Sequence, residues 1–171
     1  TLALKECPHE WWLPEARDLA ISRKVKAAPG LYTRWATDFN LRLKDGYFED
    51  VDSYMIDSLT LLGHSCLAEE LAAGHKDERM AYRRAGETMT DVMWAIASLP
   101  CHVLMTVHTR YGEGDEGRGE HRLTVPGGSK LFLPRFVSAL WFTSLVETKD
   151  RGPRYHVLTR PQRFWPHVRT P

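Results

Sequence analysis

Between residues 51 and 108 the sequence passes from a strand-like pattern to two helix-like patterns and back, and this succession constrains the fold most. Ser53 to Ile56 (SYMI) is predicted as a short buried strand, and residues 101–107 (CHVLMTV) are an apolar run of strand length. Between these two predicted strands, apolar side chains at helical spacing predict two helices, over 61–73 and 77–99. Strand, helix, strand is the pattern of a parallel sheet covered by helices, so an α/β fold is expected.

The other segments are expected to complete one domain over residues 1–171. Apolar residues at steps of four predict a short helix over 31–43. Residues 137–146 and 154–159 are predicted to be two strands of an antiparallel hairpin at the end of the sheet. The glycine-rich, charged stretch 110–126 cannot be core, and we expect it to be a mobile loop or an extended hairpin.

Length, charge and cysteine content exclude several classes of protein. A chain of 171 residues with 43% hydrophobic and 26% charged residues can bury a full core and is not disordered. No apolar run approaches the roughly 20 residues of a membrane-spanning helix, so no membrane partner is expected. A net charge of +1 limits any nucleic-acid contact to a local patch. Three scattered cysteines without a CxxC pair favour a reducing cytoplasm.

An acidic residue directly after a predicted strand is the first candidate for chemistry. Asp57 follows Ile56 and is followed at once by Ser58 and Thr60. A carboxylate held at the carboxyl end of a buried strand can bind Mg²⁺, directly or through water, where ligands bind in open α/β sheets. Because Asp and Ser are also good helix caps, Asp57 could instead cap the helix that follows, and the spacing leaves both interpretations open.

His108 ends the next predicted strand and is the second candidate. Carboxyl ends of parallel strands meet at one sheet edge, so His108 would lie within reach of a phosphate bound beside Asp57. The alternative is an ordinary solvent-facing histidine. Lys130 follows Gly127 and Gly128, a flexible arrangement that can deliver a cation across a subunit interface, although a simple turn explains the same residues.

The arginines of the glycine-rich stretch could contact a nucleic-acid backbone. They alternate with a similar number of acidic side chains, so a solvated surface loop is the competing interpretation. The arginines concerned are Arg110, Arg118 and Arg122. Several catalytic motifs are missing from the sequence, which contains no GxxxxGK[ST] phosphate loop, no HExxH, no GxSxG and no GxGxxG.

Residues 51–166 resemble the RecA-like P-loop ATPases, and among them the small phage-encoded AAA-type ATPases related to single-strand recombinases. The segment SYMIDSLT (53–60) is similar to the Walker B strand of that family. LPCHVLMTVH (99–108) resembles the strand that carries its phosphate sensor, and PGGSKL (126–131) resembles the Gly-Gly segment after its DNA-contacting loop. The resemblance implies a three-layer RecA-like core, with a mainly parallel central sheet and a C-terminal antiparallel hairpin.

The same resemblance implies an ATPase that uses ATP and Mg²⁺ in DNA recombination or repair. Asp57 would hold Mg²⁺, with Ser58 or Thr60 in support, His108 would sense the γ-phosphate and Lys130 would act in trans. The protein would work as a homo-oligomer on single-stranded DNA, in the cytoplasm of a bacterium or a phage-infected cell, with arginines of the loop contacting the DNA.

The chain departs from the family pattern in two places. The Walker A loop is missing, and Thr1 to Leu4 looks like the start of the helix that follows it, so the natural chain is expected to carry this loop upstream of Thr1. The catalytic glutamate has no clear counterpart. Two alternatives therefore stay open: a non-catalytic scaffolding module without the phosphate loop, or a nucleic-acid binder that uses Trp11 and Trp12 for base stacking.

Overall fold

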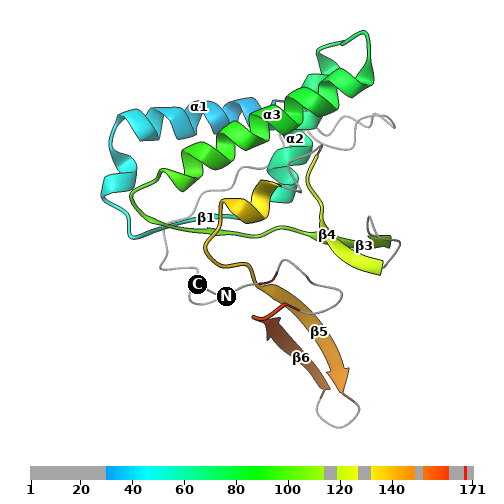
Figure 1. The fold of residues 1–171 in the computed structure, drawn as a ribbon. Helices are drawn as coiled ribbons and strands as arrows, with labels where there is room; N and C mark the ends of the chain where they lie inside the picture. Colours follow the sequence, from blue (N-terminus) through cyan, green and yellow to red (C-terminus); the bar gives the residue numbers. More distant parts are fainter. Residues whose placement is uncertain (1–29, 114–118, 127–131, 149–151, 162–167, 169–171) are drawn as a thin grey trace.

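The computed structural model describes residues 30–113, 119–126, 132–148, 152–161 and 168. The described helices are α1 (Leu31–Lys44), α2 (Leu59–Ala72) and α3 (Glu78–Ala97), with short 3-10 turns η2 (Tyr47–Glu49) and η3 (Leu133–Arg135). The described strands are β1 (Ser53–Ile56), β2 (His102–Met105), β3 (Thr109–Glu113), β4 (Gly119–Leu123), β5 (Phe142–Thr148) and β6 (Gly152–Leu158). Figure 1 shows the helices gathered above β1 and β2, with β5 and β6 extending away below.

The helical layer encloses most of the core. Helix α2 contacts both α1 and α3, and it buries side chains on most of its circumference because it lies between them. Helix α3 contributes three side chains at helical spacing, Met89, Met93 and Ile96, each at most 2% exposed. Leu59, the first residue of α2, is fully buried at 0% exposure. The core therefore sits between the helices and the sheet beneath them.

An aromatic cluster joins α1 to the first strand. Trp35 and Phe39 lie one helical turn apart on the buried face of α1, with ring centroids 5.0 Å apart. Phe39 packs on Phe48 of η2, which meets Tyr54 of β1 edge to face at 5.2 Å. Aromatic pairs at this separation add to the stability that burial provides. The predicted helix over 31–43 and the strand after it are thus fixed to one another.

A carboxylate from α2 caps the start of α1. The residue before α1, Gly30, has no side chain to cap the helix. Glu69 accepts a hydrogen bond from the backbone N–H of Thr33 at 3.1 Å and another from the Thr33 hydroxyl. The first turn of a helix leaves N–H groups without partners, and a negative charge is favourable there. This contact links the start of α1 to α2.

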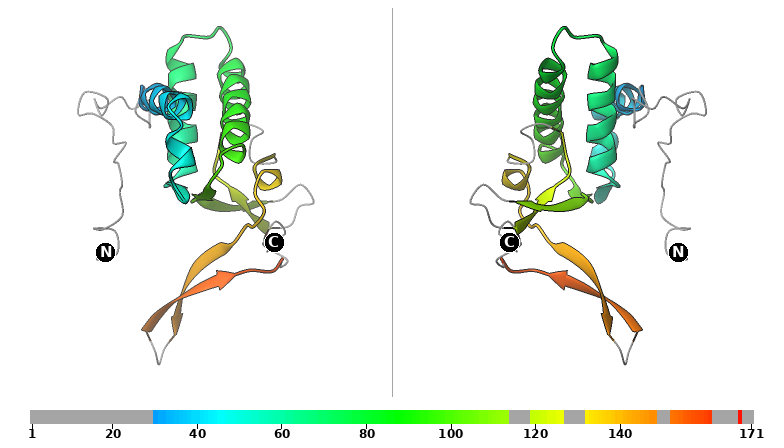
Figure 2. Two further views of the ribbon diagram at one scale, coloured as in Figure 1. Left: turned by 90° about the vertical axis from the view of Figure 1, so that its left-hand side faces the viewer. Right: turned by 90° about the vertical axis from the view of Figure 1, so that its right-hand side faces the viewer.

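Strands β1 and β2 form a two-stranded parallel sheet that is covered on one face. Their register runs from Ser53 opposite His102 to Ile56 opposite Met105. Alternate residues face the helices, while Met55 and Leu104 on the other face are 53% and 55% exposed. Figure 2 shows the helices on one side of this sheet and the β5–β6 hairpin projecting from the other. The described residues therefore form two layers here, one of helices and one of strands.

The prediction of a three-layer RecA-like core with a mainly parallel central sheet is wrong. The described strands form three separate two-stranded sheets, and only the β1–β2 pair is parallel. A parallel pair needs a long crossover, and the segment from β1 to β2, with its two helices, supplies one for this pair. The described strands after β2 pair as β3–β4 and β5–β6, each with its neighbour in sequence, so each pair is antiparallel.

Most individual elements were predicted close to their observed bounds. The predicted strand 53–56 coincides with β1, and the predicted helices 61–73 and 77–99 correspond to α2 and α3. The C-terminal antiparallel pairing is present as β5–β6, although as a sheet of its own. In the stretch 110–126, the described residues form most of the β3–β4 hairpin.

Candidate functional site

Asp57 and Thr106 lie opposite one another just beyond the carboxyl ends of β1 and β2. The parallel pairing continues past the strands, because the Thr106 N–H donates to the Ile56 carbonyl at 3.0 Å and the Leu59 N–H donates to the Thr106 carbonyl at 2.9 Å. The Thr106 hydroxyl donates a hydrogen bond to Oδ1 of Asp57. The Asp57 side chain is exposed, and the peptide bond that follows it is cis. A carboxylate is thus held, with solvent access, at the edge where the sequence placed it.

The hydroxyls of Ser58 and Thr60 are both engaged by backbone groups. Ser58 is the N-cap of α2, and its hydroxyl accepts from the Leu61 N–H at 3.3 Å. Thr60 is 6% exposed, and its hydroxyl accepts from the His108 N–H at 2.9 Å. Of the two interpretations of Asp57, the capping role therefore belongs to the next residue, which leaves the Asp57 carboxylate to Thr106 and solvent.

His108 is held by its main chain between the helical body and the β3–β4 hairpin. Its N–H bonds to Thr60 at the start of α2, and its carbonyl accepts from the Thr124 N–H at 2.8 Å. The His108 side chain itself is exposed. The structure thus brings Asp57, Thr60 and His108 to the same end of the two parallel strands, as the sequence predicts for strands whose ends meet at one edge.

A cleft of about 900 Å³ adjoins this end of the sheet. It is lined by all of β2, by residues 106–109 that follow the strand, and by the segment 136–143. Among the described residues that line it, none is an Asp, Glu, Lys or Arg. His121 lies in its wall, with its ring 5.1 Å from Tyr111 and 5.6 Å from Phe142, and burial lowers the pKa of this imidazole. The cleft therefore favours uncharged groups, whereas the Asp57 carboxylate stands beside it.

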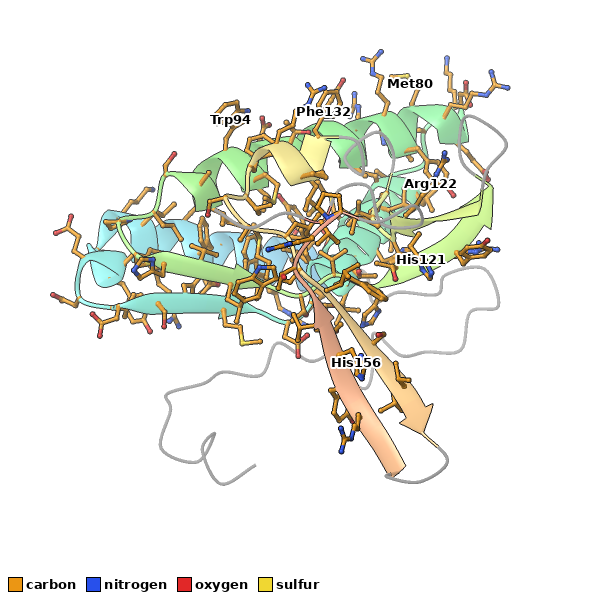
Figure 3. The ribbon with its side chains drawn as sticks, turned by 60° about the horizontal axis from the view of Figure 1, so that its bottom comes forward. Met80, Trp94, His121, Arg122, Phe132 and His156 are labelled. Atoms are coloured by element: carbon orange, nitrogen blue, oxygen red, sulfur yellow. The ribbon has the colours of Figure 1, made fainter. Side chains whose placement is uncertain are left out.

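The arginine candidates are only partly described. Arg110 of β3 and Arg122 of β4 are directly opposite one another in the antiparallel register. Arg110 is exposed and Arg122 is partly exposed, and Figure 3 shows Arg122 on the ribbon next to His121. Arg118 and Lys130 lie outside the described residues. The hairpin thus brings two of the three predicted arginines together.

Other reactive groups in the described part of the chain point to no second site. There, no group of three or more His, Cys, Asp and Glu side chains is placed to hold a metal ion. Cys66 is 2% exposed, and burial raises the pKa of its thiol to about 12, so it is not a nucleophile at neutral pH.

Thr106 is the site residue that sequence reasoning missed. The observed register places the residue after Ile56 opposite the residue after Met105, whereas the apolar run in the sequence continues to Val107 and would place His108 there. Because strand register is a tertiary property, nothing in the sequence near Thr106 marks it as the partner of Asp57.

Comparison with known proteins adds no assignment to this geometry. No family model, no curated protein and no solved structure matches the chain. Among the described residues, no helix combines the length and the apolar character that crossing a membrane requires.

Proposed function

We propose that the carboxyl ends of β1 and β2 bind a Mg²⁺-nucleotide, with ATP as the nucleotide, and that the natural protein hydrolyses it. The observation that supports this is the Asp57 carboxylate, which accepts a hydrogen bond from Thr106 at the ends of two parallel strands, where the His108 main chain is bonded to Thr60. Mg²⁺ prefers oxygen ligands and keeps several bound waters. One exposed carboxylate, positioned by a hydrogen bond, can therefore serve as its protein ligand. His108, whose exposed side chain is at the same end of the strands, would hydrogen-bond a terminal phosphate.

The proposal also requires groups that hold the phosphates. Phosphate binding normally uses backbone N–H groups of a glycine-rich loop or cationic side chains, and the sequence contains no GxxxxGK[ST] motif. A phosphate-binding segment outside residues 1–171 is therefore part of the proposal. If no such segment exists, the nucleotide function fails and the two alternatives without it remain, a scaffolding module or a nucleic-acid binder.

Asp57→Asn in the full-length natural protein tests this function. The substitution keeps the shape of the side chain but removes the charge, so Mg²⁺-dependent ATP affinity should fall by about 10-fold to 100-fold, and hydrolysis should be lost. The measurements are ATP titration by calorimetry with and without Mg²⁺, and phosphate release. Asp52→Asn is the matched control, because Asp52 is an exposed carboxylate at the opposite end of β1. Unchanged Mg²⁺ dependence in Asp57→Asn would remove the carboxylate from the site.

We also propose that the β3–β4 hairpin contacts single-stranded DNA. Its support is the direct opposition of Arg110 and Arg122. Two cationic side chains on neighbouring strands can both contact the phosphates of a nucleic-acid backbone. Because the net charge of the chain is only +1, any contact with DNA must be local. The β3–β4 hairpin, with its two arginines, is such a local site.

Replacing the two arginines should weaken DNA binding and its salt dependence. For Arg110→Ala and for Arg122→Ala, the slope of log affinity against log salt should decrease by about 1 each. Fluorescence anisotropy of a labelled oligonucleotide across a salt series measures this. Arg79→Ala, which removes an exposed arginine from α3, is the control and should leave the slope unchanged. Equal slopes in all four proteins would exclude the hairpin as a DNA contact.

A further inference from the structure

We infer that Thr106 is the positioning residue of this site: its hydroxyl holds Oδ1 of Asp57 so that Oδ2 is presented to the ligand. The inference rests on the proposed function for the identity of that ligand, Mg²⁺ or its waters. The contact itself is observed, since the Thr106 hydroxyl donates to Oδ1 of Asp57. Nothing in the sequence pattern assigned a role to Thr106.

The main chain of Thr106 is fixed on both sides of Asp57. Its N–H bonds to the carbonyl of Ile56, the residue before Asp57, and its carbonyl accepts from the N–H of Leu59, two residues after it. A threonine is also restricted at χ1, because two heavy atoms branch from its Cβ. The hydroxyl therefore has a fixed position relative to the carboxylate that it contacts.

The other hydroxyls near Asp57 are committed elsewhere. Ser58 accepts from the Leu61 N–H, and Thr60 accepts from the His108 N–H. Both bonds shape the backbone around the site, one at the helix start and one at the exit from β2. Of these three hydroxyls, Thr106 is the one that contacts the carboxylate.

A hydrogen bond to Oδ1 of Asp57 also restricts the position of Oδ2. An exposed aspartate that has no hydrogen-bond partner rotates about χ1 and χ2. Binding a metal ion fixes both angles and therefore costs conformational entropy. A hydrogen bond from a fixed donor removes the rotation beforehand, and partners of this kind typically change metal affinity by about 10-fold to 100-fold.

Three variants of the 171-residue chain and its full-length parent test the inference. Thr106→Val removes the hydroxyl at constant shape, Thr106→Ser restores it, and Thr37→Val makes the same chemical change on the exposed side of α1. Three-bond NMR couplings of Asp57 report its χ1 rotamer in the 171-residue chain. Calorimetry reports Mg²⁺-dependent ATP affinity in the parent.

In the wild type, in Thr106→Ser and in Thr37→Val, the couplings should show one Asp57 rotamer. In Thr106→Val they should show averaging, and Mg²⁺-dependent ATP affinity should fall by about tenfold. Thr106→Ala takes the place of the valine variant if the latter does not fold. A single Asp57 rotamer in Thr106→Val would overturn the inference, as would failure of Thr106→Ser to restore the wild-type couplings. If the couplings respond as expected but the wild-type parent binds no nucleotide, positioning by Thr106 is upheld and the proposed nucleotide function fails.

Discussion

Leu59→Ala is expected to lower the free energy of unfolding by about 3 to 5 kcal/mol. Leu59 is 0% exposed at the start of α2, where the helical layer meets the end of β1. Removing its side chain forfeits the burial energy and leaves a cavity, and α2 cannot move to fill it because it is packed between α1 and α3. Urea denaturation followed by circular dichroism measures the change.

Leu104→Ala is the matched control for that variant. The substitution is chemically identical, but Leu104 lies on the uncovered face of β2 and is 55% exposed. Its cost should stay below about 1 kcal/mol, because much of its transfer free energy is not gained on folding. Equal costs for the two leucines would show that the face of the sheet opposite the helices is buried in solution, which would contradict the two-layer arrangement.

Gly63→Ala is expected to destabilise the protein by about 1 to 3 kcal/mol, although alanine is the better helix former by about 1 kcal/mol. A Cβ on Gly63 would lie 2.7 Å from Cδ of Pro126, far inside contact distance. The proline ring cannot rotate away as a flexible side chain would, so α2 or the segment after β4 must shift. Thermal unfolding of the variant measures the loss.

Two further variants separate this clash from other causes. Pro126→Ala removes the ring atoms that a new Cβ on Gly63 would meet. The double variant Gly63→Ala/Pro126→Ala should therefore lose less unfolding free energy than the sum of the two single losses. Gly112→Ala on β3 meets nothing within 4 Å and should be nearly neutral. A stabilising effect of Gly63→Ala alone would show that α2 does not pack against Pro126.

Most of the predictions that were confirmed depend on neighbours in sequence, and the parallel pairing of β1 with β2 is the long-range exception. The strand over 53–56 and the helices after it were predicted because apolar spacing records which side of each element is buried. The predicted helix over 31–43 is observed as α1 with its stripe of Leu31, Trp35 and Phe39 buried. Because such patterns depend only on the local chain, these predictions are correct although the prediction of the whole fold is wrong.

The predictions that were wrong or incomplete depend on pairing between distant segments. A succession of strands and helices is compatible with one continuous sheet or with several small ones, and the described strands form separate pairs. Thr106 was missed for the same reason, because its contact with Asp57 spans 49 residues and exists only in the register of β1 and β2.

The sequence by itself determined the elements and the position of Asp57 directly after a strand. The tertiary structure decided which strands pair, which face of the β1–β2 sheet the helices cover, and that Asp57 faces the Thr106 hydroxyl while Ser58 caps α2. The physical reason is that local patterns reflect the periodic burial of each element, whereas strand partners and side-chain contacts are selected by the packing of the whole core.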